Sequence, residues 1–394
     1  MPTYNTKIGA FCATHDDWDL RLCSPPYNLK IKWKSGFVIF NYNQLESDFS
    51  NEIVREARGI IFKDGEWEHP VCHAFDKFFN YGEPNCAELD WGTAKCTEKI
   101  DGSIMKLWCY DGTWHVSTNG NIDASDAPVP DVRKDDFNQL FWEGITKNLT
   151  EYYNGIPQFV PWLDSLNKDF TYIFEMVSPY TRVVIPYKDT DVYFLGARDN
   201  ISGRQFGCGI DTAAKLDVSM FPRPKIYPMQ TLTQVTAAAN TLPWDAEGYV
   251  CYDENFNRCK IKSPKYVLAH FARNNNVITR WHLIDVILRG EMDEFKIYAS
   301  DYADQIDYTK RLMDDYVQFM DACALITRNL RKLDRKEAAE VIKKFHNIVQ
   351  NIMFMNLDRL VGGREYTKDW DTYKWERALE NYTKFLVRGP ENDL

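Results

Sequence analysis

The sequence contains no long hydrophobic run. None of its apolar stretches approaches the roughly 18 residues that a membrane-spanning helix needs. Its first residues, MPTYNTKIGAF, also lack the basic start and apolar core of a secretion signal. We therefore expect neither a membrane partner nor export, and hence a cytoplasmic protein.

Two patterns that mark common binding sites are also missing. The ten cysteines are scattered, and no two of them form a C-x-x-C pair. Structural zinc is therefore not expected, whereas reduced thiols in a cytosol-like compartment are. No G-x-x-x-x-G-K-[ST] loop occurs, so any site for a nucleoside triphosphate is not of the P-loop kind.

The sequence has fewer positively than negatively charged residues. The 47 Lys and Arg residues are outnumbered by 57 Asp and Glu residues, and the formal net charge is −10. This balance argues against a surface coated with phosphate-binding groups. It does not exclude a local basic groove, because a phosphate responds to the nearby field more than to the total charge.

The composition that is present suits a globular core, with 44% hydrophobic and 14% aromatic residues. Residues 1–277 show short β-prone runs broken by Gly, Asn and Asp, with a few helices between them. Residues 278–394 show helical periodicity and almost no strand pattern. We predict an α+β fold, with antiparallel sheets and flanking helices over 1–277 and an all-α domain over 278–394.

Local patterns place several elements within the first region. Asp111-Gly112, between two β-prone runs, predicts the two-residue turn of a hairpin. A helix is expected from about Asp136, because apolar residues then recur at helical spacing. The stretch 247–262 predicts a second hairpin.

The stretch EKIDGSIMKLW, residues 98–108, places a lysine just before an Asp-Gly turn. The four-residue pattern K-x-D-G alone is weak evidence, since it occurs by chance in roughly one chain in ten of this length. Lys99 is either a solvated lysine before a turn or a group that is presented in a pocket. In the second case Gly102 would permit the tight turn that aims Lys99 inward.

The hairpin 247–262 carries two lysines of its own. Lys260 and Lys262 stand two residues apart in CKIK, so period-two geometry places both ammonium groups on one face of a strand. Two lysines on a core face would be very costly. The face is therefore either solvated or lines a cleft, where it would suit a phosphate.

Three further charges stand among apolar neighbours. Arg58 begins the β-prone run ARGIIF, Lys77 lies among aromatics in FDKFFNYGE, and Glu175 interrupts the apolar run IFEMV. A carboxylate in such a strand needs a partner or a ligand. Arg58 could equally form an ordinary ion pair, and Lys77 could extend over Phe78 and Phe79.

Taken in order, these motifs resemble the covalent nucleotidyltransferase superfamily of ATP-dependent ligases and mRNA capping enzymes. EKIDGSIM is similar to its nucleotidyl-lysine motif, and IFEMV, EGYV and CKIK are similar to its third, fourth and fifth motifs. ARGIIF, FDKFFNYGE and RVVIPY resemble the RNA ligase 1 family, typified by the T-even bacteriophage tRNA-repair enzyme. The resemblance spans about residues 35–270, and that family also carries an all-helical C-terminal domain.

The resemblance implies an ATP-dependent RNA ligase that joins 5′-phosphate and 3′-hydroxyl RNA ends through lysyl-AMP and RNA-adenylate intermediates. It implies ATP and Mg²⁺ or Mn²⁺ as cofactors, RNA such as cleaved tRNA as the partner, and no obligate protein partner. If a phage encodes the chain, the place of action is the host cytoplasm.

The resemblance also assigns catalytic roles. Lys99 would be the nucleophile that attacks the α-phosphate of ATP. Lys260 and Lys262 would favour its neutral form and hold the α-phosphate as charge develops. Glu247, which begins the motif EGYV, would help to position metal or nucleotide.

Other positions complete the implied site. Arg58 and Lys77 would contact phosphates or ribose, and Glu175 would bond a ribose hydroxyl. Asp293, in an acidic stretch beyond the domain boundary, is a candidate metal ligand together with Glu247. Asn119 departs from the family pattern, which carries a lysine there, so no role is assigned to it.

The helical tail contains a basic run that we expect on one helical face, at three- and four-residue spacing. It is a candidate surface for RNA or tRNA contact, or else a solvated face whose charges interleave with acids. The run consists of Arg328, Arg331, Lys332, Arg335 and Lys336.

Rival functions remain. A DNA ligase or a capping guanylyltransferase is disfavoured by the tail, which lacks the short alternating strands of an OB barrel. A degenerate nucleotidyltransferase that serves only as an RNA-binding module is the alternative outside enzymes. The core motif positions are filled, which argues against such decay.

Overall fold

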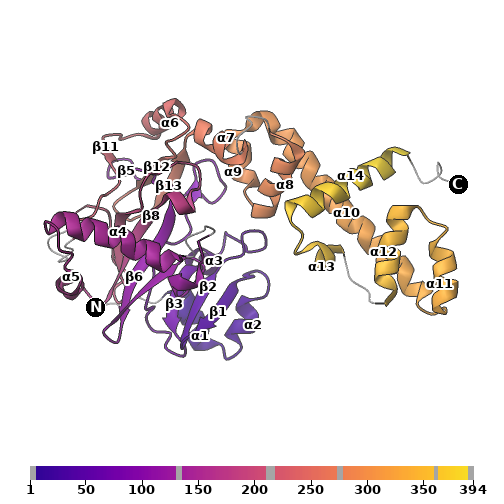
Figure 1. The fold of residues 1–394 in the computed structure, drawn as a ribbon, viewed down its shortest axis with the longest axis horizontal. Helices are drawn as coiled ribbons and strands as arrows, with labels where there is room; N and C mark the ends of the chain where they lie inside the picture. The colour runs from indigo at the N-terminus through magenta and orange to yellow at the C-terminus, as the bar shows by residue number, and fades with distance from the viewer. Residues whose placement is uncertain (1–5, 130–134, 210–217, 273–277, 359–362, 389–394) are drawn as a thin grey trace. The chain divides into compact units, whose positions relative to one another are not determined.

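A computed structural model describes residues 6–129, 135–209, 218–272, 278–358 and 363–388 (Figure 1). By its internal contacts the chain divides into two compact units, Met1–His270 and Phe271–Leu394. The predicted boundary at 277/278 borders residues 273–277, which lie outside the described residues.

The first unit is α+β, as predicted. Its described helices are α1 (Lys7–Thr14), α2 (Trp18–Leu22), α3 (Glu52–Glu56), α4 (Phe137–Tyr152), α5 (Phe159–Ser165), α6 (Leu232–Thr241) and α7 (Pro264–Ala272). Its described strands are β1 (Lys30–Lys34), β2 (Phe37–Asn41), β3 (Arg58–Lys63), β4 (Phe79–Asn80), β5 (Lys95–Glu98), β6 (Ser103–Tyr110), β7 (Thr113–Thr118), β8 (Phe170–Val177), β9 (Asp191–Asp199), β10 (Gln205–Phe206), β11 (Ile226–Tyr227), β12 (Gly248–Tyr252) and β13 (Arg258–Lys262).

These strands form three sheets. The first sheet has the order β1-β2-β3, the second β10-β9-β8-β6-β7 and the third β11-β5-β12-β13-β4. Their neighbours pair antiparallel, as predicted, except that β13 runs parallel to the two-residue strand β4. The crossovers bring segments distant in the chain together, so that β5 lies beside β12.

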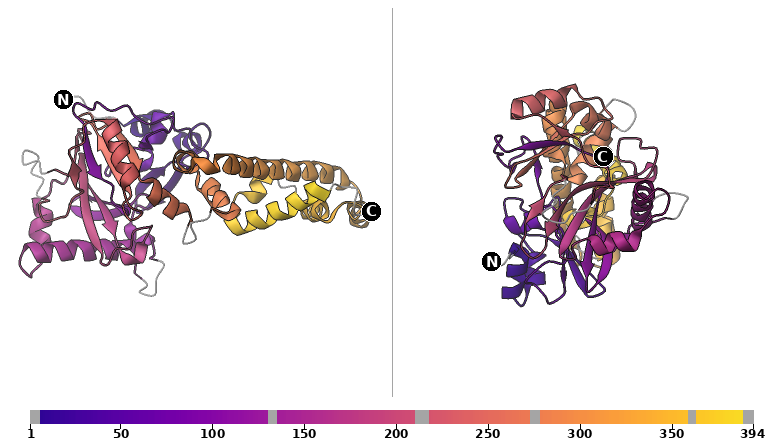
Figure 2. Two further views of the ribbon diagram at one scale, coloured as in Figure 1. Left: turned by 90° about the horizontal axis from the view of Figure 1, so that it is seen from above. Right: turned by 90° about the vertical axis from the view of Figure 1, so that its left-hand side faces the viewer.

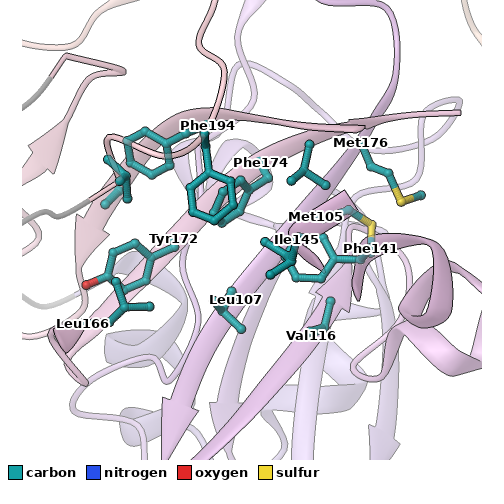
Figure 3. Close-up of a cluster of buried hydrophobic side chains, with 14 of the residues drawn as sticks. Met105, Leu107, Val116, Phe141, Ile145, Leu166, Tyr172, Phe174, Met176 and Phe194 are labelled. Carbon is teal, nitrogen blue, oxygen red and sulfur yellow. The ribbon is translucent and has the colours of Figure 1, made fainter. Parts of the chain in front are cut away.

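The largest core lies between the second sheet and α4 (Figures 1 and 3). In β8, Tyr172, Phe174 and Met176 share one face, and Phe141 and Ile145 of α4 pack against that face. Because strand residues alternate between faces, the odd-numbered residues of β8 point to the other side of the sheet. That other side carries the charged groups described below.

Local sequence signals produced the expected elements. β6 and β7 form a hairpin whose turn residues, Asp111 and Gly112, have φ values of 48° and 75°, as a type I′ turn requires. α4 begins one residue after Asp136, whose side chain and that of Gln139 form a capping box. β12 and β13 form the second predicted hairpin.

The second unit is helical in its described residues, as predicted. It contains α8 (Arg280–Arg289), α9 (Met292–Tyr298), α10 (Ala303–Leu330), α11 (Arg335–Ile342), α12 (Asn347–Asp358), α13 (Gly363–Thr367) and α14 (Thr372–Arg388). Figure 2 shows α10 as one long helix. Among the helices that the structure describes, none combines the length and the apolar character needed to cross a bilayer.

The prediction that the basic run of the tail shares one helical face is wrong. Arg328 lies in α10, which ends at Leu330, whereas Arg335 begins a new helix, α11. Asp334 caps α11 by accepting hydrogen bonds from the backbone N–H groups of residues 336 and 337. The cap ends the helical register, so the basic residues are divided between two helices and a turn.

Candidate active site

The first unit contains a cavity of about 300 Å³ that we call the lysine pocket. Residues from all three sheets line it. The predicted residues that line it are Arg58, Lys99, Glu175, Lys260 and Lys262. They come from β3, the end of β5, β8 and β13, so the fold brings together charges that are up to about 200 positions apart in the sequence.

Lys99 occupies the pocket rather than bulk solvent. It directly follows β5, and its backbone N–H donates to the Gly248 carbonyl at 2.9 Å, which extends the pairing of β5 with β12. Its Nζ lies 2.7 Å from Oε1 of the buried Glu247, and its side chain is only 21% exposed. Lys262 Nζ lies 3.5 Å from the same oxygen. Glu247 thus bridges two of the predicted lysines.

The Asp-Gly pair after Lys99 has two different functions in the fold. Buried Asp101 accepts hydrogen bonds from the backbone N–H groups of Val184 and Ile185 at 3.0 and 2.8 Å, and from the Tyr266 hydroxyl at 2.7 Å. Asp101 therefore fixes the chain beyond Lys99 to the segment RVVIPY and to α7. Tyr266, which also follows the fifth motif, serves this network.

Gly102 is required for close packing rather than for an unusual turn. It is not among the glycines of positive φ. A Cβ at this position would stand 2.4 Å from the Met176 carbonyl oxygen and 3.0 Å from Glu175 Cγ. The absence of a side chain lets the start of β6 approach β8, which brings Glu175 close to the Lys99 loop. The expectation that Gly102 is needed for a tight turn is therefore wrong, since it is needed for close packing.

β13 presents three cations to the pocket. Arg258, Lys260 and Lys262 alternate along the strand and all line the cavity. Arg258 packs over the Phe75 ring at 4.3 Å and donates to Gln205 Oε1 at 2.7 Å. Burial, and then the charge of Arg198, lower the pKa of Arg258 to about 9, so it stays charged at neutral pH. Sequence reasoning missed Arg258, although the same period-two spacing includes it.

Arg58 has unfilled hydrogen-bonding capacity. Its guanidinium lies over the Phe78 ring at 5.1 Å, and Lys260 Nζ lies near the same ring at 5.7 Å. Its buried Nη1 has no hydrogen-bond partner among the described residues, and neither does the buried Oδ1 of Asn119. Both residues line the pocket. Because a buried polar atom without a partner is costly, the Arg58 nitrogen suits an anion, whereas the Asn119 oxygen suits a hydrogen-bond donor of the ligand.

Lys106, in β6, lies fully buried beside this wall and was not predicted. Its Nζ donates a hydrogen bond to the Gly59 carbonyl at 2.5 Å. Burial, with a smaller contribution from the charge of Arg58, lowers the pKa of Lys106. Gly59 has a φ of 73° and directly follows Arg58. The bond therefore fixes the backbone that carries Arg58, and strand periodicity alone could not separate it from an exposed lysine.

Glu175 carries a proton more readily than an ordinary glutamate. Burial raises its pKa to about 7, although the nearby Lys99 charge opposes the rise. Glu247 adds to the rise because it is a second carboxylate close by. Near neutral pH the Glu175 carboxyl is therefore partly protonated and able either to donate or to accept a hydrogen bond.

Lys77 does not line the lysine pocket. Its Nζ lies 4.9, 5.2 and 5.6 Å from the ring centres of Tyr42, Phe49 and Phe79. It borders an adjoining hollow of about 470 Å³, which shares Phe78 and Arg258 with the pocket. The packing over aromatic rings that sequence left open is therefore what the structure contains. A nucleotide contact by Lys77 stays a prediction.

The two candidate metal ligands lie in different units. Glu247 precedes β12, whereas Asp293 lies in the first turn of α9 in the second unit. Within the described parts of the chain, no group of three or more His, Cys, Asp and Glu side chains is arranged to hold a metal ion. Asp293 stays a prediction.

The pocket as a whole is cationic. Five positive side chains line it, which are Arg58, Lys99, Arg258, Lys260 and Lys262. The carboxylates that face them are fewer, and one of these is bonded to Lys99. A partly closed cavity with convergent cations strengthens its hold on phosphate groups. The arrangement suits an anionic ligand with apolar parts beside Phe75 and Phe78.

Comparison with known proteins points to one family. A sequence model described as RNA ligase matches residues 56–266, a stretch that includes the whole lysine pocket. A protein of Autographa californica nuclear polyhedrosis virus, named as a bifunctional polynucleotide kinase/RNA ligase, is 29% identical over 284 residues. That match covers 68% of this chain and 38% of the viral protein.

An RNA ligase of Rhodothermus phage RM378 is 26% identical over 323 residues, which is 67% of this chain and 70% of the phage protein. The chain thus spans well under half of the first relative and about two thirds of the second. Among solved structures, an archaeal ATP-dependent RNA ligase is 13% identical, with 78% of this chain and 79% of that chain covered and a TM-score of 0.44. A likeness this remote has no weight for function.

Proposed function

The chain belongs to the RNA ligase family, and from that premise we propose that it is an ATP-dependent RNA ligase. It would join 5′-phosphate and 3′-hydroxyl RNA ends through lysyl-AMP and RNA-adenylate intermediates. The observation that supports this best is the convergence of Lys99 with four other cations in one pocket. A degenerate nucleotidyltransferase that only binds RNA would not need a half-buried lysine that is paired with a buried glutamate.

In the first step, Lys99 Nζ would attack the α-phosphorus of ATP. A nitrogen–phosphorus bond would form, and the bond to the leaving pyrophosphate would break. Lys260 and Lys262 would stabilise the negative charge that builds on the α-phosphate. Arg58, whose Nη1 is unpaired among the described residues, would bind a phosphate or ribose oxygen.

Lys99 must lose a proton before it attacks. The Glu247 carboxylate, 2.7 Å from Nζ, is the group placed to receive that proton. Glu175, whose pKa burial raises to about 7, would hydrogen-bond a ribose hydroxyl as donor or acceptor. These roles use residues that touch the nucleotide, so each substitution should act on nucleotidyl transfer itself.

The site offers a divalent metal one carboxylate ligand, that of Glu247. Mg²⁺ commonly takes one or two protein carboxylates and completes its shell with substrate phosphates and water. Glu247, which borders the pocket through Lys99 and Lys262, supplies such a carboxylate. When bound, the metal would neutralise phosphate oxygens and favour the departure of pyrophosphate.

In the later steps, AMP would pass from Lys99 to an RNA 5′-phosphate, and a 3′-hydroxyl would then attack that phosphate and release AMP. We propose RNA repair, including cleaved tRNA, as the context, in the cytoplasm of the cell or of a phage's host. The second unit would contact the RNA, with the adenylyltransferase activity confined to the first.

Covalent labelling tests the proposal. The purified protein is incubated with Mg²⁺ and ATP that is labelled at the α-phosphate, without RNA, and label on the protein is measured after denaturation. We expect label from ATP and not from GTP, and peptide mapping should place AMP on Lys99. Label from GTP alone would indicate a capping guanylyltransferase instead.

The RNA-binding alternative makes a different prediction. Without enzymatic activity, the protein would take up no covalent label. Lys99→Ala and the wild type would then not differ in the joining of RNA ends. A ligase should instead convert a 5′-phosphorylated RNA to a circle or a longer product. That conversion should need ATP and Lys99.

A further inference from the structure

Four cysteines gather on one face of the third sheet. Cys96 of β5, Cys251 of β12 and Cys259 of β13 stand side by side across three neighbouring strands. The Cys96 and Cys251 sulfur atoms are 3.0 Å apart. Cys86, in the segment after β4, packs against this cluster and lines the same surface hollow as Cys259. Sequence patterns did not predict this cluster, because 155 positions separate Cys96 from Cys251 in the chain.

The cluster lies on the reverse side of the strands that form the lysine pocket. Each of the three strand cysteines is followed or preceded by a residue that lines the pocket, namely Thr97, Val250 and Lys260. Since successive residues of a strand point to opposite faces, the thiols and the pocket share three strands but not a surface. A change at the thiols therefore acts on the pocket through the strands.

The four thiols differ in access. Cys86 and Cys259 line a surface hollow of about 500 Å³, together with Trp91 and Leu232. Cys86 is half-buried, whereas Cys96 and Cys251 have no exposed surface. Cys259 is only 2% exposed, but it lines the hollow. A small oxidant in solution can therefore reach Cys86 and, through the hollow, Cys259, but neither Cys96 nor Cys251.

Hydrogen bonding makes the two thiols of this pair unequal. Bonds from the Cys251 and Cys86 thiols lower the pKa of the Cys259 thiol. The interaction with Cys259, together with burial, raises the pKa of the Cys86 thiol. The thiolate is the form that reacts in disulfide chemistry. A metal site is not the better explanation, because within the described residues no group of three or more ligating side chains is arranged around a common point.

We propose that hydrogen peroxide oxidises Cys86 and Cys259 to a disulfide, and that this bridge slows the nucleotidylation of Lys99. Peroxide that enters the hollow oxidises the Cys259 thiolate to a sulfenic acid, and its other oxygen leaves as hydroxide, which becomes water with the proton that Cys259 gave up. The Cys86 sulfur then attacks the Cys259 sulfur, and a second water leaves as the S–S bond forms. Two thiols thus lose two electrons and two protons to one peroxide.

The bridge acts on β13 because Cys259 stands between Arg258 and Lys260. Its sulfur must move from hydrogen-bonding separation to bonding distance, and β13 or the segment after β4 must move with it. β4 is itself paired to β13 at residues 259 and 260. A displacement of about 1 Å near reacting groups can cost about 10²-fold in rate, so we expect the oxidised protein to be at least tenfold slower.

The test uses the full chain before and after treatment with peroxide. Remaining thiols are alkylated, the protein is digested, and cross-linked peptides are identified by mass spectrometry. In parallel, the rate of lysyl-AMP formation is measured, and again after dithiothreitol. We expect a peptide pair that joins Cys86 to Cys259, a slower rate, and recovery on reduction.

Cys86→Ala removes the accessible partner without touching the pocket, so it should keep its rate in peroxide. Cys23→Ala, at an exposed cysteine outside the cluster, should respond like the wild type. Alkylated Cys86 after peroxide, a bridge between Cys96 and Cys251 in its place, or an unchanged rate in the bridged protein would each overturn the proposal. The rate measurement rests on the proposed function, whereas the peptide map does not. Reduced protein that forms no lysyl-AMP would therefore refute the ligase proposal and leave the map to decide the bridge.

Discussion

The Lys99 ammonium lies 2.7 Å from the Glu247 carboxylate, in a pocket that four other cations line. This contact holds the proposed nucleophile in position while it is charged, and it places next to the amine a base that could take up the proton. Although Glu247 is buried, this contact keeps its carboxylate next to the reacting amine.

Replacing Lys99 should abolish covalent labelling. Lys99→Ala removes the nucleophile, and Lys99→Arg should fail as well, because a guanidinium keeps its proton in proteins. Both variants should reduce lysyl-AMP to background in the α-phosphate labelling assay. Lys95→Ala, at an exposed lysine that begins β5, serves as the control and should keep its activity. Full labelling of Lys99→Ala would remove Lys99 from the mechanism.

The lysines of β13 should be needed for the rate of that step. Lys260→Ala and Lys262→Ala each remove a charge that faces the developing negative charge, so labelling should slow on the order of 10²-fold. The control is Lys265→Ala, just beyond the strand and exposed, which should stay close to wild type. Normal rates in both pocket variants would show that these cations serve only folding or solubility.

Tyr266 should act as a positioning residue through Asp101. Tyr266→Phe removes the 2.7 Å hydrogen bond to Asp101 and leaves the two backbone donors in place. We expect a loss of stability of about 1 kcal/mol and a severalfold slower labelling rate with little change in the KM for ATP. Thermal unfolding and initial rates measure the two effects, and the exposed Tyr373→Phe is the control. A change in KM alone would assign Tyr266 to nucleotide binding.

Gly102 should tolerate no side chain. In Gly102→Ala the new Cβ would lie 2.4 Å from the Met176 carbonyl oxygen, so β6 and β8 must separate. Overpacking of this kind costs about 1–3 kcal/mol, which should lower the unfolding midpoint and the labelling rate together. Gly120→Ala is the matched control, since nothing lies within 4 Å of its added Cβ. Equal midpoints for the two variants would contradict the close approach of β6 and β8.

Glu175 should make stability depend on pH. Burial raises its pKa to about 7 from 4.5, so the folded protein binds this proton more tightly than the unfolded chain does. Its contribution to stability is therefore full below about pH 4.5 and is lost as pH rises through about 7. Glu175→Gln stays neutral, so its unfolding midpoint should exceed that of the wild type at pH 8 and match it near pH 4.5.

The control for Glu175 is Glu151→Gln, at an exposed glutamate in α4. Its difference from the wild type should stay constant across the same pH range. A Glu175→Gln protein that is less stable than the wild type at pH 8 would show that the charged carboxylate is stabilised by its neighbours, contrary to the direction of the shift.

Several elements of the fold, and the types of side chain that line the pocket, could be predicted from local sequence patterns. Period-two spacing placed Lys260 and Lys262 on one face, Asp111-Gly112 formed the predicted hairpin turn, and Asp136 capped the predicted helix. These signals are local, since each depends on residues within one or two helical turns or one strand pair. The basic run of the tail was predicted from a local pattern as well, but the Asp334 cap divides it between two helices. The same reading would have added Arg258, which shares the period of the two lysines.

The neighbours of these side chains could not be predicted in this way, because they depend on the tertiary fold. Gly102 has no room for a side chain because β8 packs against it. The buried Lys106 donates its hydrogen bond to the Gly59 carbonyl, and Lys77 packs over aromatic rings beside the pocket. The thiol cluster joins Cys86 to strands whose cysteines follow much later in the chain. Such contacts depend on which strands become neighbours, and strand order is set by packing of the whole unit rather than by any short stretch of sequence.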